Sequence, residues 1–207
     1  ECRGYYNRAV IRAYTFDGAA LSLQWEYNSG GEGLYGQGNH NLSIADIDND
    51  GCDEIVYGSA ALDNDGKTVL GNTGYGHGDA LHVSDFNNDG IQEAFSVKEE
   101  DYRDHGGNFR VAGTGEDLFN LTGANDDVGR GVMDNIDDDY AASHPNALAM
   151  GWTSAHPDTY DLNGDSVNTK PAPAGSGSFD NFLIYWGGDL ARELLDANII
   201  QKYDADT

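Results

Sequence analysis

Two short acidic segments have residue types and spacing suited to binding a divalent cation. The segment Asp46–Glu54 (DIDNDGCDE) recurs 39 residues later as Asp85–Glu93 (DFNNDGIQE). In both, oxygen-bearing side chains occupy positions 1, 3 and 5, glycine occupies position 6 and glutamate occupies position 9. Ca²⁺ prefers roughly six to eight hard oxygen ligands, and a tight loop with acids at alternate positions turns three of them toward one ion. The spacing therefore predicts two calcium sites, which we call the first and second acidic loops.

The predicted ligands of these loops include backbone carbonyls at position 7. The full sets are Asp46, Asp48, Asp50, Cys52 and Glu54, and Asp85, Asn87, Asp89, Ile91 and Glu93. An EF-hand is not expected, because its glutamate at position 12 is replaced by Tyr57 and Ser96. Acidic hairpin turns without a metal remain the alternative.

Two looser acidic segments follow, and both lack the later glutamate. Their candidate ligands are Asn135, Asp137 and Asp139, and Asp161, Asn163 and Asp165. Tyr140 stands where the first two loops have glycine. Calcium binding and simple acidic turns both stay open for these two segments.

The segments that flank the first two loops alternate and contain β-branched residues, as strands do. Turn signals recur every 8 to 12 residues inside a longer repeat of 40 to 50 residues, a pattern typical of β-propeller blades. We therefore predict an all-β fold of three to four blades forming one domain over residues 1–207, with a flexible connector at 171–178. The only helical periodicity lies at 189–196.

Charge and composition exclude several functions. The 11 Lys and Arg residues against 36 Asp and Glu give a net charge of −25, which opposes unassisted binding to nucleic acid. No apolar run approaches the ~18 residues of a membrane span, so no membrane partner is expected. Cys2 and Cys52 match no zinc pattern, and either one disulfide or two unpaired thiols can result.

Several stretches together resemble the rhamnogalacturonan lyases of polysaccharide lyase family 11. They lie in order over most of the chain, at residues 36–43, 45–48, 53–58, 76–85, 129–131 and 185–196. The resemblance implies part of an eight-bladed β-propeller, loaded with Ca²⁺, that cleaves the rhamnogalacturonan I backbone of pectin by β-elimination. It also implies a secreted protein.

The same resemblance gives candidate catalytic residues, because His40, His77 and Arg130 fall in stretches that match cleft-lining positions of the family. Calcium bridging protein acids to galacturonate would let a strongly acidic protein hold an acidic polysaccharide. Arg130 could clamp a carboxylate through two hydrogen bonds. The simpler alternative is that His40 and His77 only bond the backbone of a neighbouring blade.

Two functions remain from the sequence. The first is a calcium-dependent rhamnogalacturonan lyase. The second is a non-catalytic, calcium-loaded β-scaffold that binds acidic glycans or assembles with copies of itself into a ring or filament. Enzymes of the family are several times longer than this chain, so blade faces left uncovered here would pair with other copies.

Overall fold

The computed structural model describes residues 2–3, 8–30, 38–67, 69–98, 106–121, 130–137, 148–152, 157–168, 182–189, 191–196 and 199–202. Within this part of the chain the regular structure consists of antiparallel strands without a helix, so the predicted all-β class is confirmed. No described segment forms a helix long and apolar enough to cross a membrane. The predicted connector at 171–178 lies outside the described residues.

The described strands form five sheets, each containing strands that are consecutive in the chain. The sequence repeat predicted only three or four such units. In chain order the sheets are β1 (Cys2–Arg3), β2 (Val10–Phe16) and β3 (Leu21–Asn28); β4 (Ser43–Ala45), β5 (Glu54–Tyr57), β6 (Ala60–Leu62) and β7 (Val69–Asn72); β8 (Leu81–Ser84), β9 (Glu93–Val97), β10 (Gly107–Val111) and β11 (Asp117–Leu121); β12 (Arg130–Asp134), β13 (Leu148–Trp152), β14 (Pro157–Tyr160) and β15 (Ser166–Asn168); and β16 (Phe182–Ile184), β17 (Glu193–Asp196) and β18 (Ile199–Gln201).

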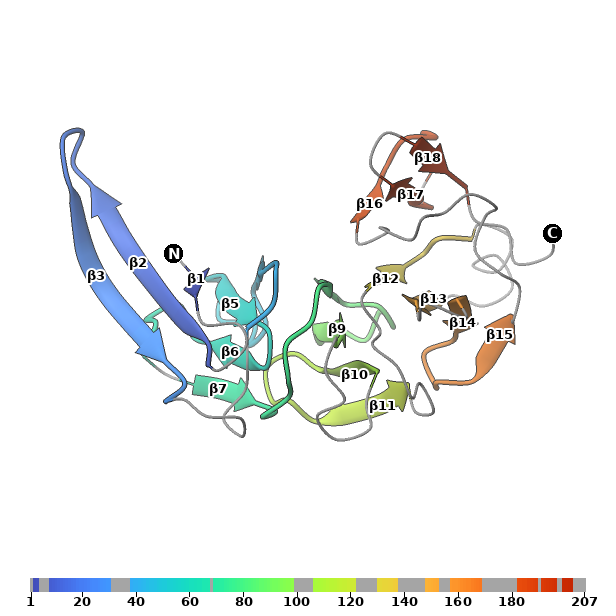
Figure 1. The fold of residues 1–207 in the computed structure, drawn as a ribbon, viewed down its shortest axis with the longest axis horizontal. Helices are drawn as coiled ribbons and strands as arrows, with labels where there is room; N and C mark the ends of the chain where they lie inside the picture. The colour runs from blue at the N-terminus through green and yellow to red at the C-terminus, as the bar shows by residue number, and fades with distance from the viewer. Residues whose placement is uncertain are drawn as a thin grey trace.

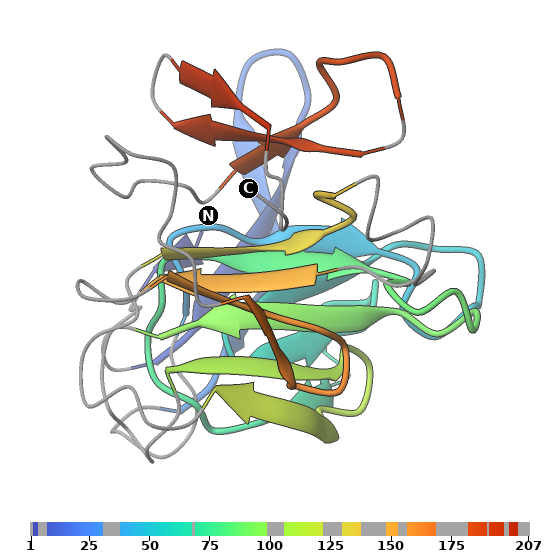
Figure 2. The ribbon, with the colours of Figure 1, turned by 90° about the vertical axis from the view of Figure 1, so that its right-hand side faces the viewer.

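The five sheets follow one another around an open arc (Figure 1). The first strand β4 contacts β8, β8 contacts β12, and β12 contacts β16, so the first strands of successive sheets are neighbours. Loops that join first and second strands project from one end of the sheets, on the right in Figure 2. The described segments that precede β4 and β8 therefore lie at the opposite end.

The hydrophobic core lies in layers between consecutive sheets, and side chains of β9 contribute to two of these layers. All five residues of β9 are buried. Phe95 and Val97 pack with residues of β10–β12, whereas Ala94 packs toward the sheet β4–β7. Because successive side chains of a strand point to opposite faces, this strand is covered by a sheet on each side.

The helical periodicity at 189–196 is a wrong prediction, because Glu193–Asp196 is the strand β17. β17 pairs with both β16 and β18, and Leu194 is fully buried there. Two backbone ladders and a buried side chain outweigh the weak helical preference of an eight-residue segment.

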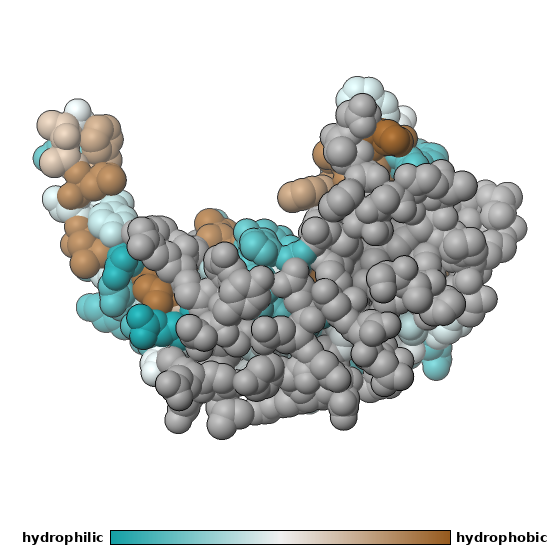
Figure 3. Space-filling view, viewed as in Figure 1, coloured by the Kyte–Doolittle hydropathy of each residue, from teal (hydrophilic) through white to brown (hydrophobic). Residues whose placement is uncertain are grey.

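The hairpin β2–β3 extends beyond the body of the molecule and carries an exposed apolar face (Figures 1 and 3). Tyr14 pairs with Leu23 and Phe16 pairs with Leu21, so these four side chains share one face of the ribbon. All four are exposed, Leu21 by 67%. The Asp17–Gly18 pair, a typical hairpin-turn sequence, forms its tip, where Gly18 has a φ of 99°.

Candidate functional site

The backbone brings the two predicted histidines together at the end of the sheets that lies opposite the acidic loops. Asn39 and Gly78 form an isolated parallel bridge, and the amide of His40 donates to the carbonyl of Gly78 at 3.2 Å. The Asn39 side chain donates to the carbonyl of Ala80 at 3.0 Å. These bonds hold the segment before β4 against the segment before β8.

Gly78 is required for this approach. A β-carbon at position 78 would lie 1.6 Å from the carbonyl oxygen of Val97 in β9. Only a residue without a side chain allows the strand and the two segments to meet.

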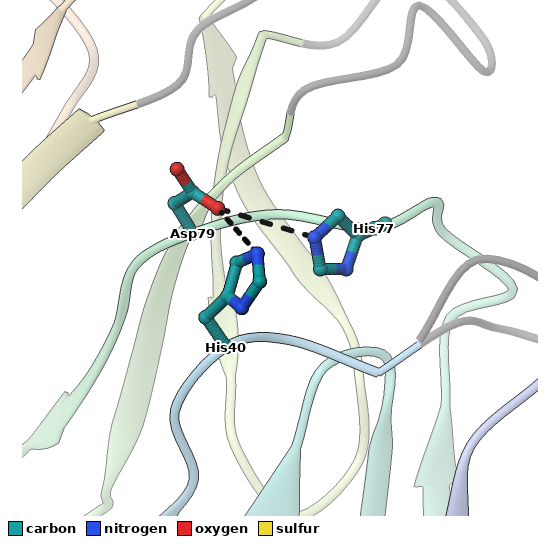
Figure 4. Close-up of side chains that lie close together, drawn as sticks. All are labelled: His40, His77 and Asp79. Carbon is teal, nitrogen blue, oxygen red and sulfur yellow. Dashed lines mark ion pairs between the residues drawn. The ribbon is translucent and has the colours of Figure 1, made fainter. Parts of the chain in front are cut away.

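His40, His77 and Asp79 form a compact cluster (Figure 4). Nε2 of His40 lies 3.2 Å from Oδ1 of Asp79, and Nε2 of His77 lies 3.9 Å from the same oxygen. The two imidazole rings meet edge to face, with centroids 4.8 Å apart. His77 is fully buried, whereas the side chain of His40 is 51% exposed, so the cluster opens to solvent on the side of His40.

A hydrogen bond to the backbone determines which ring nitrogen of His77 faces Asp79. Nδ1 of His77 lies 2.8 Å from the carbonyl oxygen of Gly38 and must donate to it. In the neutral ring, Nε2 is then an acceptor that faces the Asp79 carboxylate, so two acceptors point toward each other.

A divalent cation fits between these acceptors. One ligand atom from each of His40, His77 and Asp79 lies within 4.8 Å of the other two. Imidazole fixed by a backbone carbonyl on its second nitrogen is the usual form of a metal-bound histidine. The donor set of two imidazoles and a carboxylate accepts first-row divalent metals as well as harder cations.

Asp79 was not predicted from the sequence. It lies two residues after His77, in the segment His77-Gly78-Asp79. In so acidic a chain, a single aspartate at this spacing is only a weak indication of a functional site. Arg130, the third predicted catalytic residue, begins β12, and its side chain is outside the described residues. The next residue, Gly131, accepts a bond from Nε2 of His82 at 3.2 Å, which places the start of β12 beside β8.

The other histidine of this end, His82, is structural. Its burial lowers the pKa of the imidazole to about 4, with a smaller contribution in the same direction from the charge of Arg192. The ring is therefore neutral at ordinary pH and donates from Nε2 to β12.

Two basic side chains, Lys98 and Arg110, are buried between the sheets. Nζ of Lys98 lies 3.2 Å from the centre of the Tyr75 ring, and the Tyr75 hydroxyl donates to Asp117 at 2.6 Å. Arg110 donates to Ser96, Asn108 and the carbonyl of Gly58, which joins two neighbouring sheets. Burial lowers the pKa of Arg110 to about 10, so it stays charged.

The first and second acidic loops have the same geometry. In each, the amide of position 5 donates to the side chains of positions 1 and 3, and the amides of positions 6 and 7 donate to positions 1 and 5. Asn49 and Asn88, at position 4, adopt φ values of 64° and 61°. The carboxylates of Asp46, Asp48 and Asp50 converge within 4.8 Å, and so do Asp85, Asp89 and Glu93.

The glutamate at position 9 points back into each loop from the start of the second strand. Oε2 of Glu54 accepts the amide of Ile47, and Oε2 of Glu93 accepts the amide of Phe86, both at 2.9 Å. Oε1 of Glu54 is buried without a hydrogen-bond partner. Burial raises the pKa of Glu54, and it raises that of Glu93 to about 6.

The Glu54 oxygen fits a hard cation, because a buried carboxylate oxygen without a donor is costly unless an ion satisfies it. At position 7, Ile91 is 46% exposed, and Cys52 is exposed with a free thiol. The nearby charge of Asp50 raises the pKa of that thiol. Calcium coordination by the two loops remains a prediction.

The two looser acidic segments occupy different places. Asn135 and Asp137 follow β12, at the same place in their sheet as the first two loops, but Asp139 is outside the described residues. Asp161–Asp165 instead joins β14 to β15, where the other sheets have plain hairpin turns such as Asp63–Gly66. Oδ1 of Asp161 accepts the amides of Asn163 and Asp165, both at 2.9 Å.

Comparison with known proteins gives the same relationship for the whole chain. Over 209 residues it is 44% identical to the rhamnogalacturonan endolyase YesW of Bacillus subtilis, covering 98% of this chain and 31% of that protein. It is 43% identical over 222 residues to the rhamnogalacturonan exolyase YesX of the same organism, covering 99% of this chain and 34% of that protein.

The solved structure of a rhamnogalacturonan lyase of Bacillus licheniformis matches with a TM-score of 0.81 and 41% identity, over 99% of this chain and 33% of that one. The chain thus spans about a third of the length of the relatives it matches. The family model described as rhamnogalacturonan lyase family 11, C-terminal domain, matches residues 1–207. The chain therefore belongs to rhamnogalacturonan lyase family 11.

Proposed function

We propose that this chain is part of a secreted, calcium-dependent lyase that cleaves the rhamnogalacturonan I backbone by β-elimination. The observation that carries the proposal is the cluster of His40, His77 and Asp79, which is open to solvent only on the side of His40. The relatives named endolyase and exolyase act on rhamnogalacturonan, and both modes remain open here.

A β-elimination next to a uronate has defined requirements. A base removes the proton beside the carboxylate, the glycosidic C–O bond breaks, the leaving oxygen takes up a proton, and a carbon–carbon double bond forms in the uronate. His40, His77 and Asp79 would hold a divalent cation, whose positive charge would neutralise the uronate carboxylate and make the adjacent proton easier to remove.

The residues of this chain hold the reacting groups. The bond from Nδ1 of His77 to the Gly38 carbonyl turns Nε2 toward Asp79, and one oxygen of Asp79 lies within 3.2 Å and 3.9 Å of the Nε2 atoms of His40 and His77. His40 is the exposed member and meets the substrate. Arg130 binds a substrate carboxylate, as the family resemblance implies.

The five sheets are proposed to be consecutive blades of a β-propeller, and the first and second acidic loops are proposed to hold Ca²⁺. Face-to-face packing of successive four-stranded sheets and neighbouring first strands support the propeller. The converging carboxylates and the buried oxygen of Glu54 support the ions.

The activity is tested on the full-length natural protein with rhamnogalacturonan I and Ca²⁺, by the ultraviolet absorbance of the unsaturated product. We expect His77→Ala, Asp79→Asn and Arg130→Ala each to lower the rate by about 10²-fold or more, the usual scale for a positioned acid–base or charge-stabilising group.

Asp63→Asn, in the turn between β6 and β7, is the control and should keep the wild-type rate. Full activity of His77→Ala or Asp79→Asn would overturn the site. Binding of rhamnogalacturonan I without any unsaturated product would favour the non-catalytic scaffold instead.

A further inference from the structure

The loop between β16 and β17 is built like the acidic loops, although it has lost most of their acids. We call residues 185–193 the aromatic loop, which is described except for residue 190. Glu193, like Glu54 and Glu93, is the first residue of the second strand of its sheet. Its Oε2 accepts the amide of Trp186, seven positions earlier, at 2.8 Å, and the other two glutamates make the same bond at 2.9 Å.

The turn conformation and the burial of the glutamate agree as well. Gly188, at position 4, has a φ of 82°, matching the left-handed Asn49 and Asn88 of the acidic loops. Glu193 is 3% exposed, compared with 0% for Glu54 and 1% for Glu93. The aromatic loop is therefore a structural counterpart of the acidic loops and not an unrelated turn.

The positions that would bind an ion differ. Tyr185 and Gly187 replace the carboxylate and amide side chains at positions 1 and 3, and only Asp189 remains, at position 5. Oε1 of Glu193 accepts the backbone amide of Gly187 at 3.0 Å. The corresponding oxygen of Glu93 accepts a side chain, Nδ2 of Asn87 at 3.2 Å, and that of Glu54 has no hydrogen-bond partner among the described residues. A β-carbon at position 187 would lie 2.5 Å from Oε1 of Glu193, so a side chain there would displace the glutamate carboxylate from its bond to the Gly187 amide.

A basic residue meets the remaining acid. Nζ of Lys202, just after β18, lies 2.9 Å from Oδ2 of Asp189. A lysine from outside the loop thus places a positive charge on Asp189, the carboxylate at position 5.

We propose that the aromatic loop is a metal-independent counterpart of the acidic loops, in which Glu193 closes the loop on two backbone amides and the Lys202 ammonium replaces a divalent cation. The contrast between this loop and the acidic loops depends on the calcium sites that the proposed function assigns to the acidic loops.

The test uses the same substitution at position 5 of each loop in the full-length protein, with bound calcium counted by metal analysis and titration calorimetry. We expect Asp50→Asn and Asp89→Asn each to lower the stoichiometry by one ion per chain, and Asp189→Asn to leave it unchanged. Loss of one ion in Asp189→Asn would overturn the proposal. If no variant loses a calcium ion, the calcium assignment of the acidic loops is wrong, and the thermal-melting measurement below decides the role of the aromatic loop.

The second measurement tests the lysine by thermal melting, with Lys67→Gln as a control of equal charge change in the exposed turn before β7. We expect Lys202→Gln to lower the melting temperature by about 1–2 °C more than the control, the scale of a solvent-exposed ion pair, in saturating calcium and in EDTA alike. The additional loss should vanish when Asp189→Asn is already present. Equal melting of Lys202→Gln and Lys67→Gln would refute the role of Lys202.

Discussion

His77 and Asp79 are ionisable side chains that the fold buries beside each other at the end of the sheets where the cluster opens toward solvent. Burial of such groups is unfavourable unless hydrogen bonds or an ion satisfy them. One bond, from Nδ1 of His77 to the Gly38 carbonyl, decides which nitrogen faces Asp79. The chemistry of the site therefore depends on the orientation of a single ring, which the backbone before β4 determines.

His82 allows a pH prediction at the same scale. Its pKa is about 4 in the folded protein, compared with 6.5 for the free side chain. Between these values the unfolded chain binds the proton and the folded chain does not, so this residue's contribution to stability is present above pH 6.5 and is lost as the pH falls toward 4. The loss is about 1–3 kcal/mol.

Urea unfolding at pH 7, 6, 5 and 4 measures this contribution. His82→Gln keeps a side-chain donor for the Gly131 carbonyl but cannot titrate, so its stability should fall less steeply than that of the wild type over this interval. The carboxylates titrate in both proteins, so their contribution to the pH dependence of stability cancels in the comparison. Identical slopes would show that His82 is not buried as a neutral ring.

At the scale of elements, short connections carry the chemistry and the strands only position them. The acidic loops leave the ends of β4 and β8, while the histidine cluster lies before the starts of the same strands. The two kinds of site are thus at opposite ends of the same sheets. If the acidic loops bind the proposed calcium, that ion would stabilise the sheet whose other end carries the cluster, without contact with the proposed substrate.

Gly78→Ala tests how the elements position the cluster. The added carbon would lie 1.6 Å from the Val97 carbonyl, so the backbone must shift and the bond from the His40 amide to Gly78 must weaken. We expect a loss of about 1–3 kcal/mol in the free energy of unfolding, measured in urea, together with a lower lyase rate.

Gly18→Ala is the control, because Gly18 meets no atom within 4 Å but has a φ of 99°. That variant should lose about 1 kcal/mol through backbone strain alone and keep its lyase rate. A Gly78→Ala protein with wild-type stability and activity would contradict the close packing of these segments.

At the scale of the whole molecule, an acidic chain of net charge −25 folds into an open arc of sheets. The carboxylates of each acidic loop converge, and their mutual repulsion opposes folding, which a bound cation would relieve. The open arc also leaves apolar faces exposed at the hairpin β2–β3, in a chain that spans about a third of its relatives.

Removal of calcium should therefore destabilise the entire arc. Two sites occupied at 100 times their dissociation constants contribute about 5 kcal/mol, which corresponds to roughly 10–20 °C in melting temperature for a domain of this size. Melting followed by circular dichroism in excess EDTA and again after adding calcium back measures the effect. A melting temperature unchanged by EDTA, in protein that metal analysis finds free of calcium, would rule it out.

The sequence alone determined the features whose parts lie close together in the chain. The strand-forming flanks, the hairpin at Asp17–Gly18 and the matched geometry of the two acidic loops follow from spacing within nine residues, because turn and strand preferences are local. Position 9 was predicted as a ligand position, and Glu54 and Glu93 both point back into their loops, where they accept backbone amides; their binding of calcium stays a prediction.

Only the tertiary structure decided the features that join distant segments. Asp79 belongs with His40 and His77 because a bridge between Asn39 and Gly78 aligns two sheets, and no local pattern encodes that contact. The aromatic loop was missed for a related reason: its likeness to the acidic loops lies in backbone bonds to Glu193, while the acids that made the others recognisable are absent. Side-chain types reveal a site when they supply its ligands, but a backbone amide is the same in every residue, so a loop that relies on amides can be recognised only once it is folded.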